Sequence, residues 1–400
     1  MRRGVACVAG WLVCVTSAAR ADDVTLDQVV AAVPGAPAIP ITANEVASAE
    51  ARIDAAGAWP APTIHVETNR ITARLVAGVA VPLPILGTIG AARHEAAAHA
   101  LRVRAEGVAA RRDLQHRAVL AWLGVARADA NADTLAVAAQ QAADLEKLAR
   151  GRLDAGAGAE VDVTAAHAAR MRADLAVTGA KHEQDASAAE LAGLLGWDAM
   201  RPIHAAGGLP GGTAQLATLR AALAAHPERR VALQRIAEGE ATEANVSVQR
   251  RPSLALELSG SFSDPTQPGT DVLVGLSLEL PVFSHIGDQV RAARAQTSAE
   301  RARLSTDEAR LLGDLVAAYR RWEAATERLT GLERDVLPAQ DRAATLASQA
   351  YREGARDLAS ALQAERDRAA VRSEIANARI DAATAWIELQ LAAGGDAGAH

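Results

Sequence analysis

The sequence predicts a mainly α-helical protein with a small β part, made of two repeats that each join a β-hairpin to a long antiparallel coiled-coil hairpin. First, residues 78–90 align without a gap onto residues 275–287, 197 positions later, with Pro84 on Pro281. Second, each copy precedes a long segment with apolar residues at helical spacing. Third, half of the residues are hydrophobic but only 2% are aromatic. Small side chains suit closely packed helices better than a bulky globular core, and a duplicated junction indicates structural repeats.

A secretory signal peptide is expected over residues 1–21. Arg2 and Arg3 precede an apolar run, and Ala19-Arg20-Ala21 fits the Ala-x-Ala cleavage pattern. Both cysteines of the chain lie inside this segment, at Cys7 and Cys14. The mature chain is therefore predicted to have no thiol. It also loses three arginines, so its formal charge falls from −6 to −9, which argues against a nucleic acid partner.

The first repeat is predicted over residues 22–196. Short helices are expected within 25–58, and Thr42 followed by Glu45 has the spacing of a capping box at the start of the second helix. Alternating residues then predict a β-hairpin over 62–84. A coiled-coil hairpin follows over 88–196, with its glycine-rich reversal at 150–158.

The second repeat is predicted over residues 213–394, after a Gly/Pro-rich linker at 197–212 and before a tail at 395–400. It repeats the order of the first: short helices at 213–249, a β-hairpin at 252–283 and a coiled-coil hairpin at 287–393. Its apolar seams recur at heptad spacing. Pro338 lies inside the outgoing helix and predicts a local kink there, because proline cannot donate the helical hydrogen bond.

The junctions between strand and helix are expected at Pro84 and Gly90 in the first repeat, and at Pro281 and Gly287 in the second. Proline stops a strand ladder because it has no N–H, and glycine permits a bend. The apolar run 75–92 is a poor transmembrane helix because Pro82 and Pro84 would break it.

The second return strand alternates between two faces. Val272, Val274 and Leu276 share one face, and Gly275, Ser277 and Glu279 share the other. A soluble sandwich edge has the same pattern. If the hairpins lie in a membrane, every strand edge must be paired, and four strands are too few to close a barrel with a useful lumen. Several chains would then pool their strands.

The arrangement resembles the outer-membrane efflux factor family of TolC-like channel proteins. The matching features are the signal peptide, the opening 26–30, the two strand–Pro–Gly–helix junctions and the reversal at 350–358. The resemblance implies a homotrimer with a 12-stranded β-barrel in the outer membrane and an α-helical barrel in the periplasm. It implies as partners a periplasmic adaptor, an inner-membrane pump of the resistance–nodulation–division type and outer-membrane lipid. It leaves the substrate open, metal-efflux channels being one branch.

The same resemblance assigns a periplasmic gate to the second reversal, where Tyr351 and Arg356 stand at the family's gating positions. Ser360 and Gln363 replace the aspartates that form an acidic ring in the family. Asp162 and Asp357 are the acidic residues that could take over this role. For any single charge a solvated helix face is the simpler interpretation, and Tyr351 could equally pack against a neighbouring helix.

Contact with an adaptor at the tips is assigned, by the resemblance, to Arg152, Leu153, Gly156 and Gly354. The glycines have a simpler explanation, because a tight helix reversal favours φ > 0, which glycine adopts without penalty.

No enzyme, cofactor or metal site is predicted. His94 and His99 are five residues apart and so do not share a helix face as i,i+4 metal ligands would. No nucleotide loop or nucleophile motif stands out. Two other functions stay open, a periplasmic adaptor and a structural coiled-coil protein of the cell envelope.

Overall fold

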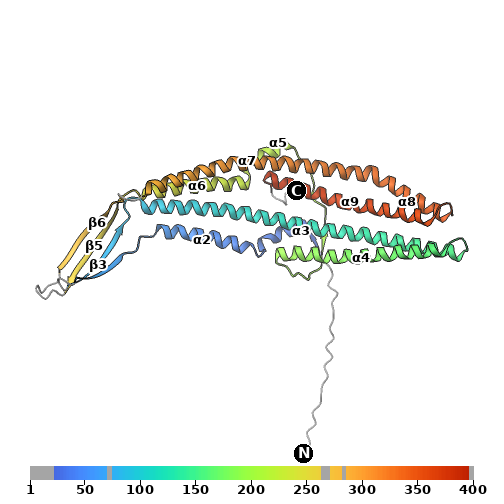
Figure 1. Cartoon of the computed structure of the whole chain (residues 1–400), viewed down its shortest axis with the longest axis horizontal. Helices are drawn as coiled ribbons and strands as arrows, with labels where there is room; N and C mark the ends of the chain where they lie inside the picture. Colours follow the sequence, from blue (N-terminus) through green and yellow to red (C-terminus); the bar gives the residue numbers. More distant parts are fainter. Residues whose placement is uncertain (1–21, 70–73, 263–270, 282–284, 396–400) are drawn as a thin grey trace, which may run out of the picture. The chain divides into compact units, whose positions relative to one another are not determined.

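The structure is a computed structural model that describes residues 22–69, 74–262, 271–281 and 285–395. The predicted signal peptide, the tips of the two predicted β-hairpins and the predicted tail at 395–400 lie wholly or partly outside these ranges. The described chain is mainly helical with a small β part (Figure 1), which confirms that part of the predicted fold class.

The helices of the first repeat are α1 (Leu26–Ala32), a 3₁₀ turn (Val33–Gly35), α2 (Ile39–Gly57), α3 (Thr88–Asp154) and α4 (Glu160–Leu195). The capping box predicted at Thr42 is wrong. Helix α2 begins three residues earlier, with Pro40 in its first turn, where proline's missing N–H costs nothing. The Thr42 hydroxyl donates instead to the Ile39 carbonyl, at 2.9 Å.

The helices of the second repeat are α5 (Leu216–Ala222), a 3₁₀ turn (Leu223–Ala225), α6 (Pro227–Val248), α7 (Ile286–Gly331), α8 (Leu337–Arg352) and α9 (Leu358–Ala393). A π-helical turn (Leu332–Val336) joins α7 to α8, and Pro338 follows it in the first turn of α8. Proline has no N–H to bond the carbonyl four residues back, and its ring clashes with that carbonyl. A π turn, with hydrogen bonds across five residues, accommodates both effects. The interruption predicted at Pro338 is therefore confirmed.

The two predicted β-hairpins join into a single antiparallel sheet. Its strands are β2 (Thr63–Asn69), β3 (Arg74–Leu83), β5 (Ser253–Phe262) and β6 (Asp271–Glu279), in the order β2-β3-β5-β6. Strand β3 pairs with β5, so the repeats meet in the middle of the sheet. Pro82 lies beyond the last residue pair of β2 with β3, Thr63 with Ala80, so on that side its missing N–H leaves no ladder bond unmade.

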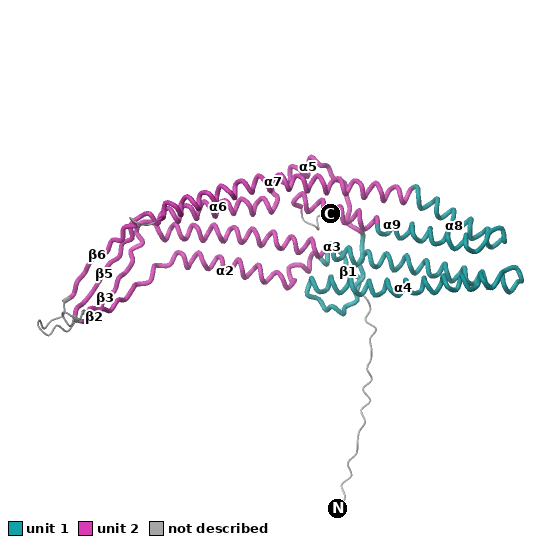
Figure 2. The backbone as a smooth tube through the Cα atoms, viewed as in Figure 1, with its two compact units in different colours: residues 1–29, 121–208, 335–377 teal, residues 30–120, 209–334, 378–400 magenta. Residues whose placement is uncertain are grey.

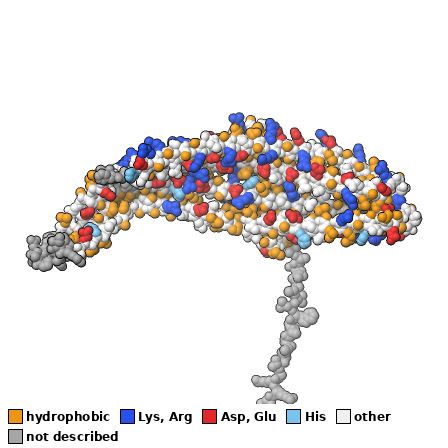
Figure 3. Space-filling view, viewed as in Figure 1, with side chains coloured by type: hydrophobic (Ala, Val, Ile, Leu, Met, Phe, Trp, Pro, Cys, Tyr) orange, Lys and Arg blue, Asp and Glu red, His pale blue; other side chains and the backbone are white. Residues whose placement is uncertain are grey.

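One face of this sheet is apolar and open. The register places Ile64, Val79, Leu258 and Val274 in one row across the four strands, and Val274 is 68% exposed. The next row on the opposite face contains His65, Gly78, Ser259 and Leu273. Figure 3 shows hydrophobic side chains spread over the strands.

A second, smaller sheet was not predicted. Strand β1 (Asp22–Thr25) pairs in parallel with β4 (Ile203–Ala206), which lies in the predicted linker. Helix α3 holds this pair through two side chains. The Trp122 indole N–H donates to the Val24 carbonyl at 2.8 Å, and the Asp129 carboxylate accepts from the Ala205 N–H at 2.9 Å.

The chain forms two compact units, which are coloured separately in Figure 2. Unit 1 comprises residues 1–29, 121–208 and 335–377, and so contains both helix reversals. Unit 2 comprises residues 30–120, 209–334 and 378–400, and contains the four-stranded sheet. Each unit draws on both sequence repeats, so the repeats are not themselves the compact units.

Candidate functional site: the two helix reversals

Both reversals of unit 1 end their incoming helix in the same way. After α3, the Ala157 N–H bonds the Arg152 carbonyl at 2.9 Å, and after α8 the Ala355 N–H bonds the Ala350 carbonyl at 2.8 Å. Such bonds across five residues need a left-handed residue just past the helix. Gly156 and Gly354 supply it, with φ of +72° and +78°. The predicted backbone role of these two glycines is confirmed.

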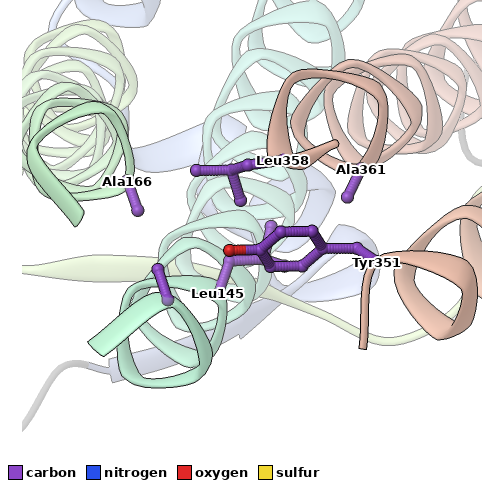
Figure 4. Packing of buried hydrophobic residues seen from close by; sticks show 6 residues of the cluster. Leu145, Ala166, Tyr351, Leu358 and Ala361 are labelled. Atoms are coloured by element: carbon purple, nitrogen blue, oxygen red, sulfur yellow. The ribbon is translucent and has the colours of Figure 1, made fainter. Parts of the chain in front are cut away.

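Tyr351 lies at the centre of the apolar cluster behind these reversals. It is 1% exposed, at the end of α8, and packs with Leu145 and Ala149 of α3, Ala166 of α4, and Leu358 and Ala361 of α9. Figure 4 shows its ring pointing in between the helices of this cluster. Side chains of both coiled-coil hairpins thus surround Tyr351. Within one chain this tyrosine packs against neighbouring helices, which is one of the two roles that the sequence left open.

Arg152 connects the two reversals. Its guanidinium lies 4.7 Å from the centre of the Tyr351 ring, a cation–π distance. One amino group donates to the Tyr351 carbonyl, and the other donates to the Ala157 carbonyl at 3.1 Å. It thereby satisfies a carbonyl at each of the two reversals, contacts that link the first hairpin to the second.

The Tyr351 hydroxyl is buried and has no hydrogen-bond partner among the described residues. Burial raises the pKa of Tyr351, the negative charge of Asp162 raises it further, and Arg152 acts in the opposite direction. Asp162 lies in the first turn of α4. The structure therefore brings Tyr351 and Asp162 of the predicted gate into the same electrostatic environment.

Arg356 and Asp357 lie on the exposed side of the second reversal, away from the buried tyrosine. Asp357 precedes α9 and accepts from the Ser360 N–H at 3.1 Å, as an N-cap does. Hydrogen bonds from the Ser360 hydroxyl and N–H lower the pKa of Asp357. Leu153 is also partly exposed, at 36%. Within one chain the predicted gate residues thus comprise the buried Tyr351, the half-buried Asp162 and two exposed residues, Arg356 and Asp357.

Glu146 is a charged residue of this region that the sequence reasoning missed. Its side chain is 2% exposed, yet it accepts from Arg150, from His167 at 3.0 Å and from Arg170 at 3.2 Å. Burial by itself raises the pKa of Glu146, but the hydrogen bonds from His167 and Arg170 outweigh it and lower the pKa. The available signal was the pair Glu146 and Arg150, one helical turn apart.

The predicted strand–helix junctions behave differently from expectation. Gly90 and Gly287 lie inside α3 and α7, so neither makes the bend. In the first junction the left-handed residue is Gly87, with φ of +86°. Pro84 follows β3 directly, and Pro281 lies two residues after β6, in agreement with the expected end of each strand.

Two absences hold for the described residues. They contain no group of three or more His, Cys, Asp or Glu side chains placed to hold a metal ion. No single helix among them is long and apolar enough to cross a membrane; the bent pair Leu26–Gly35 and Ile39–Gly57 passes by length and composition alone.

Comparison with known families bears on the second repeat. Residues 218–395 match the family model described as outer membrane efflux protein. The match covers somewhat less than half of the chain and lies almost entirely within its second repeat. The resemblance drawn from the sequence is thereby confirmed. No curated protein matches the sequence.

The whole chain has the fold of solved outer-membrane efflux channels. It matches the outer-membrane channel OprN with a TM-score of 0.77 at 21% identity, covering 92% of this chain and 90% of that one. CusC gives 0.78 at 15% identity, over 93% and 92%. VceC from Vibrio cholerae gives 0.75 at 18% identity, over 92% and 96%. The efflux protein fold therefore extends through both repeats.

Proposed function

We propose that this chain is the outer-membrane channel of a tripartite efflux system. It is a passive exit duct for substrates delivered by an inner-membrane pump, of the resistance–nodulation–division type, through a periplasmic adaptor. The observation that carries the proposal is the match of the whole chain, sheet and helices together, to solved outer-membrane channels. The open apolar face of the sheet supports it, because such a face needs an apolar environment.

The open edges of the sheet support assembly as a homotrimer. Strands β2 and β6 are the edge strands, each paired on one side only. Unpaired strand edges cannot persist in lipid. Three chains contributing the four strands of this sheet would close a 12-stranded β-barrel, and their helices would continue as an α-helical barrel in the periplasm. An adaptor normally has one coiled-coil hairpin, whereas this chain has two.

The two reversals are proposed as the periplasmic end of the duct, with Tyr351, Arg356, Asp162 and Asp357 as its gate. The buried Tyr351 ring holds the two hairpins of one chain together with Arg152. Arg356 and Asp357 are exposed and available to other copies of the chain. Opening would then require the buried contacts and the exposed contacts to loosen together.

The same tips are proposed to meet the adaptor. Leu153 offers exposed apolar surface there, and Gly156 and Gly354 keep the backbone accessible at the turns. Arg152 would act indirectly, because its guanidinium already bonds Tyr351 and Ala157 within the chain.

Membrane fractionation tests the function. Full-length protein should be found in the outer-membrane fraction, should resist a high-salt wash and should migrate as a heat-modifiable oligomer. Release of a monomer by salt would contradict the channel and favour one of the soluble envelope functions.

Single-channel recording in planar bilayers tests the gate. The double variant Tyr351→Phe, Arg356→Ser should raise the conductance. The chain offers a matched control in its other tyrosine, the variant Tyr319→Phe, Arg320→Ser on α7, which should conduct like the wild type. Unchanged conductance of the first variant would remove the Arg356 side chain and the Tyr351 hydroxyl from the gate.

A further inference from the structure

The connections between the four-stranded sheet and the helices of unit 2 carry exposed arginine, tryptophan and isoleucine side chains. Arg250 and Arg251 occupy the connection from α6 to β5, and both are exposed. Trp59 lies in the connection from α2 to β2 and is 59% exposed. Ile85, in the first junction, is 66% exposed. Figure 3 shows basic side chains where α6 and α7 approach the sheet.

Among the described residues, the two arginines differ from their neighbours in having no carboxylate partner. On α7, Arg291 pairs with Asp288, and Arg294 pairs with Glu243 at 2.8 Å. The Arg251 guanidinium donates to the Leu86 carbonyl, at 2.6 Å. In the described part of the chain no carboxylate lies within ion-pair distance of Arg250 or Arg251. Their positive charge is therefore not neutralised by any carboxylate that the structure describes.

The cationic pair adjoins the apolar face of the sheet. Arg251 lies just before β5, and the exposed Leu256 and Leu258 of the apolar face follow it five and seven residues later. After β6, the exposed Leu280 directly precedes Pro281 of the second junction. Apolar surface bordered by tryptophan and arginine is the pattern of a membrane–water interface, where the ring lies at headgroup level and the cation meets phosphate.

We propose that Arg250 and Arg251 bind the phosphate groups of anionic phospholipids in the periplasmic leaflet of the outer membrane, with Trp59, before β2 at the same end of the sheet, as an interfacial anchor. This inference rests on the proposed function, which places the sheet in that membrane. The mature chain is expected to be acidic as a whole, so attraction to anionic lipid needs a local cationic surface. The unneutralised pair supplies one where the apolar face ends.

Lipid binding to the purified full-length protein tests this assignment. Native mass spectrometry in neutral detergent would measure retention of phosphatidylglycerol against phosphatidylethanolamine. One arginine near an anionic surface is worth about a fivefold change in affinity. Arg250→Gln should therefore lower the phosphatidylglycerol preference about fivefold, and Arg250→Gln with Arg251→Gln roughly 25-fold.

Three variants serve as controls. The adjacent pair Arg320→Gln, Arg321→Gln, on α7 away from the sheet, should keep the wild-type preference. Arg250→Lys with Arg251→Lys should keep most of it, because the charge remains. Trp59→Ala should weaken retention of both lipids alike, because the ring contributes burial and not charge.

Two results would overturn the assignment. One is an unchanged lipid preference in both glutamine variants, and the other is an equal loss in the Arg320, Arg321 control. Failure of the proposed function looks different, since the wild-type protein would then be absent from the outer-membrane fraction. Protein that is found there but shows no phosphatidylglycerol preference would overturn the lipid assignment alone.

Discussion

At the scale of single residues, the reversals depend on one buried tyrosine and one arginine. Tyr351 supplies the largest side chain of the apolar cluster behind both turns, and Arg152 covers its ring and bonds its carbonyl. The sequence could place both residues at the tips, but not in contact, because they are 199 positions apart. That contact depends on how the two hairpins pack.

Two substitutions at Tyr351 should distinguish the contribution of the ring to stability from that of the hydroxyl. Tyr351→Phe keeps the packing and removes a hydroxyl that has no partner among the described residues, so stability should stay within about 1 kcal/mol of the wild type. Tyr351→Ala empties the cluster and should cost about 3–5 kcal/mol. Thermal unfolding followed by circular dichroism checks both, and a Phe variant as unstable as the Ala variant would contradict the account.

Glu146 should make the free energy of unfolding depend on pH in acidic solution. Its pKa lies below the ordinary 4.5 in the folded chain, so its contribution is present above that pH and is lost as the pH falls through the folded pKa. Glu146→Gln should therefore unfold at a lower temperature than the wild type at pH 7. The gap should close in strongly acidic buffer. A gap of constant size across this pH range would show that charge is not the cause.

At the scale of elements, glycine and proline account for most of what could be predicted. The start and end of α4 agree with the prediction because Gly158 precedes the helix and Gly196 ends it in a left-handed conformation. The capping box at Thr42 failed because Pro40 starts the helix earlier. The prediction that Gly90 and Gly287 make the bends was wrong, because alignment of the repeats identifies equivalent residues but not their backbone angles.

The turn glycines should be intolerant of a side chain for two different reasons. Gly354→Ala forces alanine to φ of +78°, which costs about 1 kcal/mol. At Gly158 a Cβ would lie 2.8 Å from the Leu153 nitrogen, so Gly158→Ala should shift the backbone. Gly151→Ala is the matched control, since it lies inside α3 with open space around it, and it should stabilise by about 0.5–1 kcal/mol. The unfolding temperature should rise for Gly151→Ala and fall for Gly354→Ala and Gly158→Ala. Equal changes at all three sites would contradict the account.

At the scale of the whole molecule, local patterns predicted the elements but not how they combine. The small β1–β4 sheet was missed because β1 directly follows the predicted signal peptide, β4 lies in the predicted linker, and the two strands meet only through long-range pairing. The direct pairing of β3 with β5 was missed for the same reason. Duplication of the sequence also suggested two repeat-sized bodies, whereas each compact unit combines parts of both repeats.

The pooling of strands between chains can be tested by disulfide cross-linking of the edge strands. Within one sheet β3 and β5 separate β2 from β6, about 14 Å at the usual strand spacing, which is too far for a disulfide. Both native cysteines lie in the predicted leader, so an engineered pair would react alone. Val66→Cys is combined in turn with Val272→Cys, Val274→Cys or Leu276→Cys.

One of these three cysteine pairs should give a covalent trimer in protein recovered from the outer membrane, because β2 of one chain would adjoin β6 of the next. Absence of any cross-link between chains at all three positions, in protein recovered from the outer membrane, would contradict the pooled barrel.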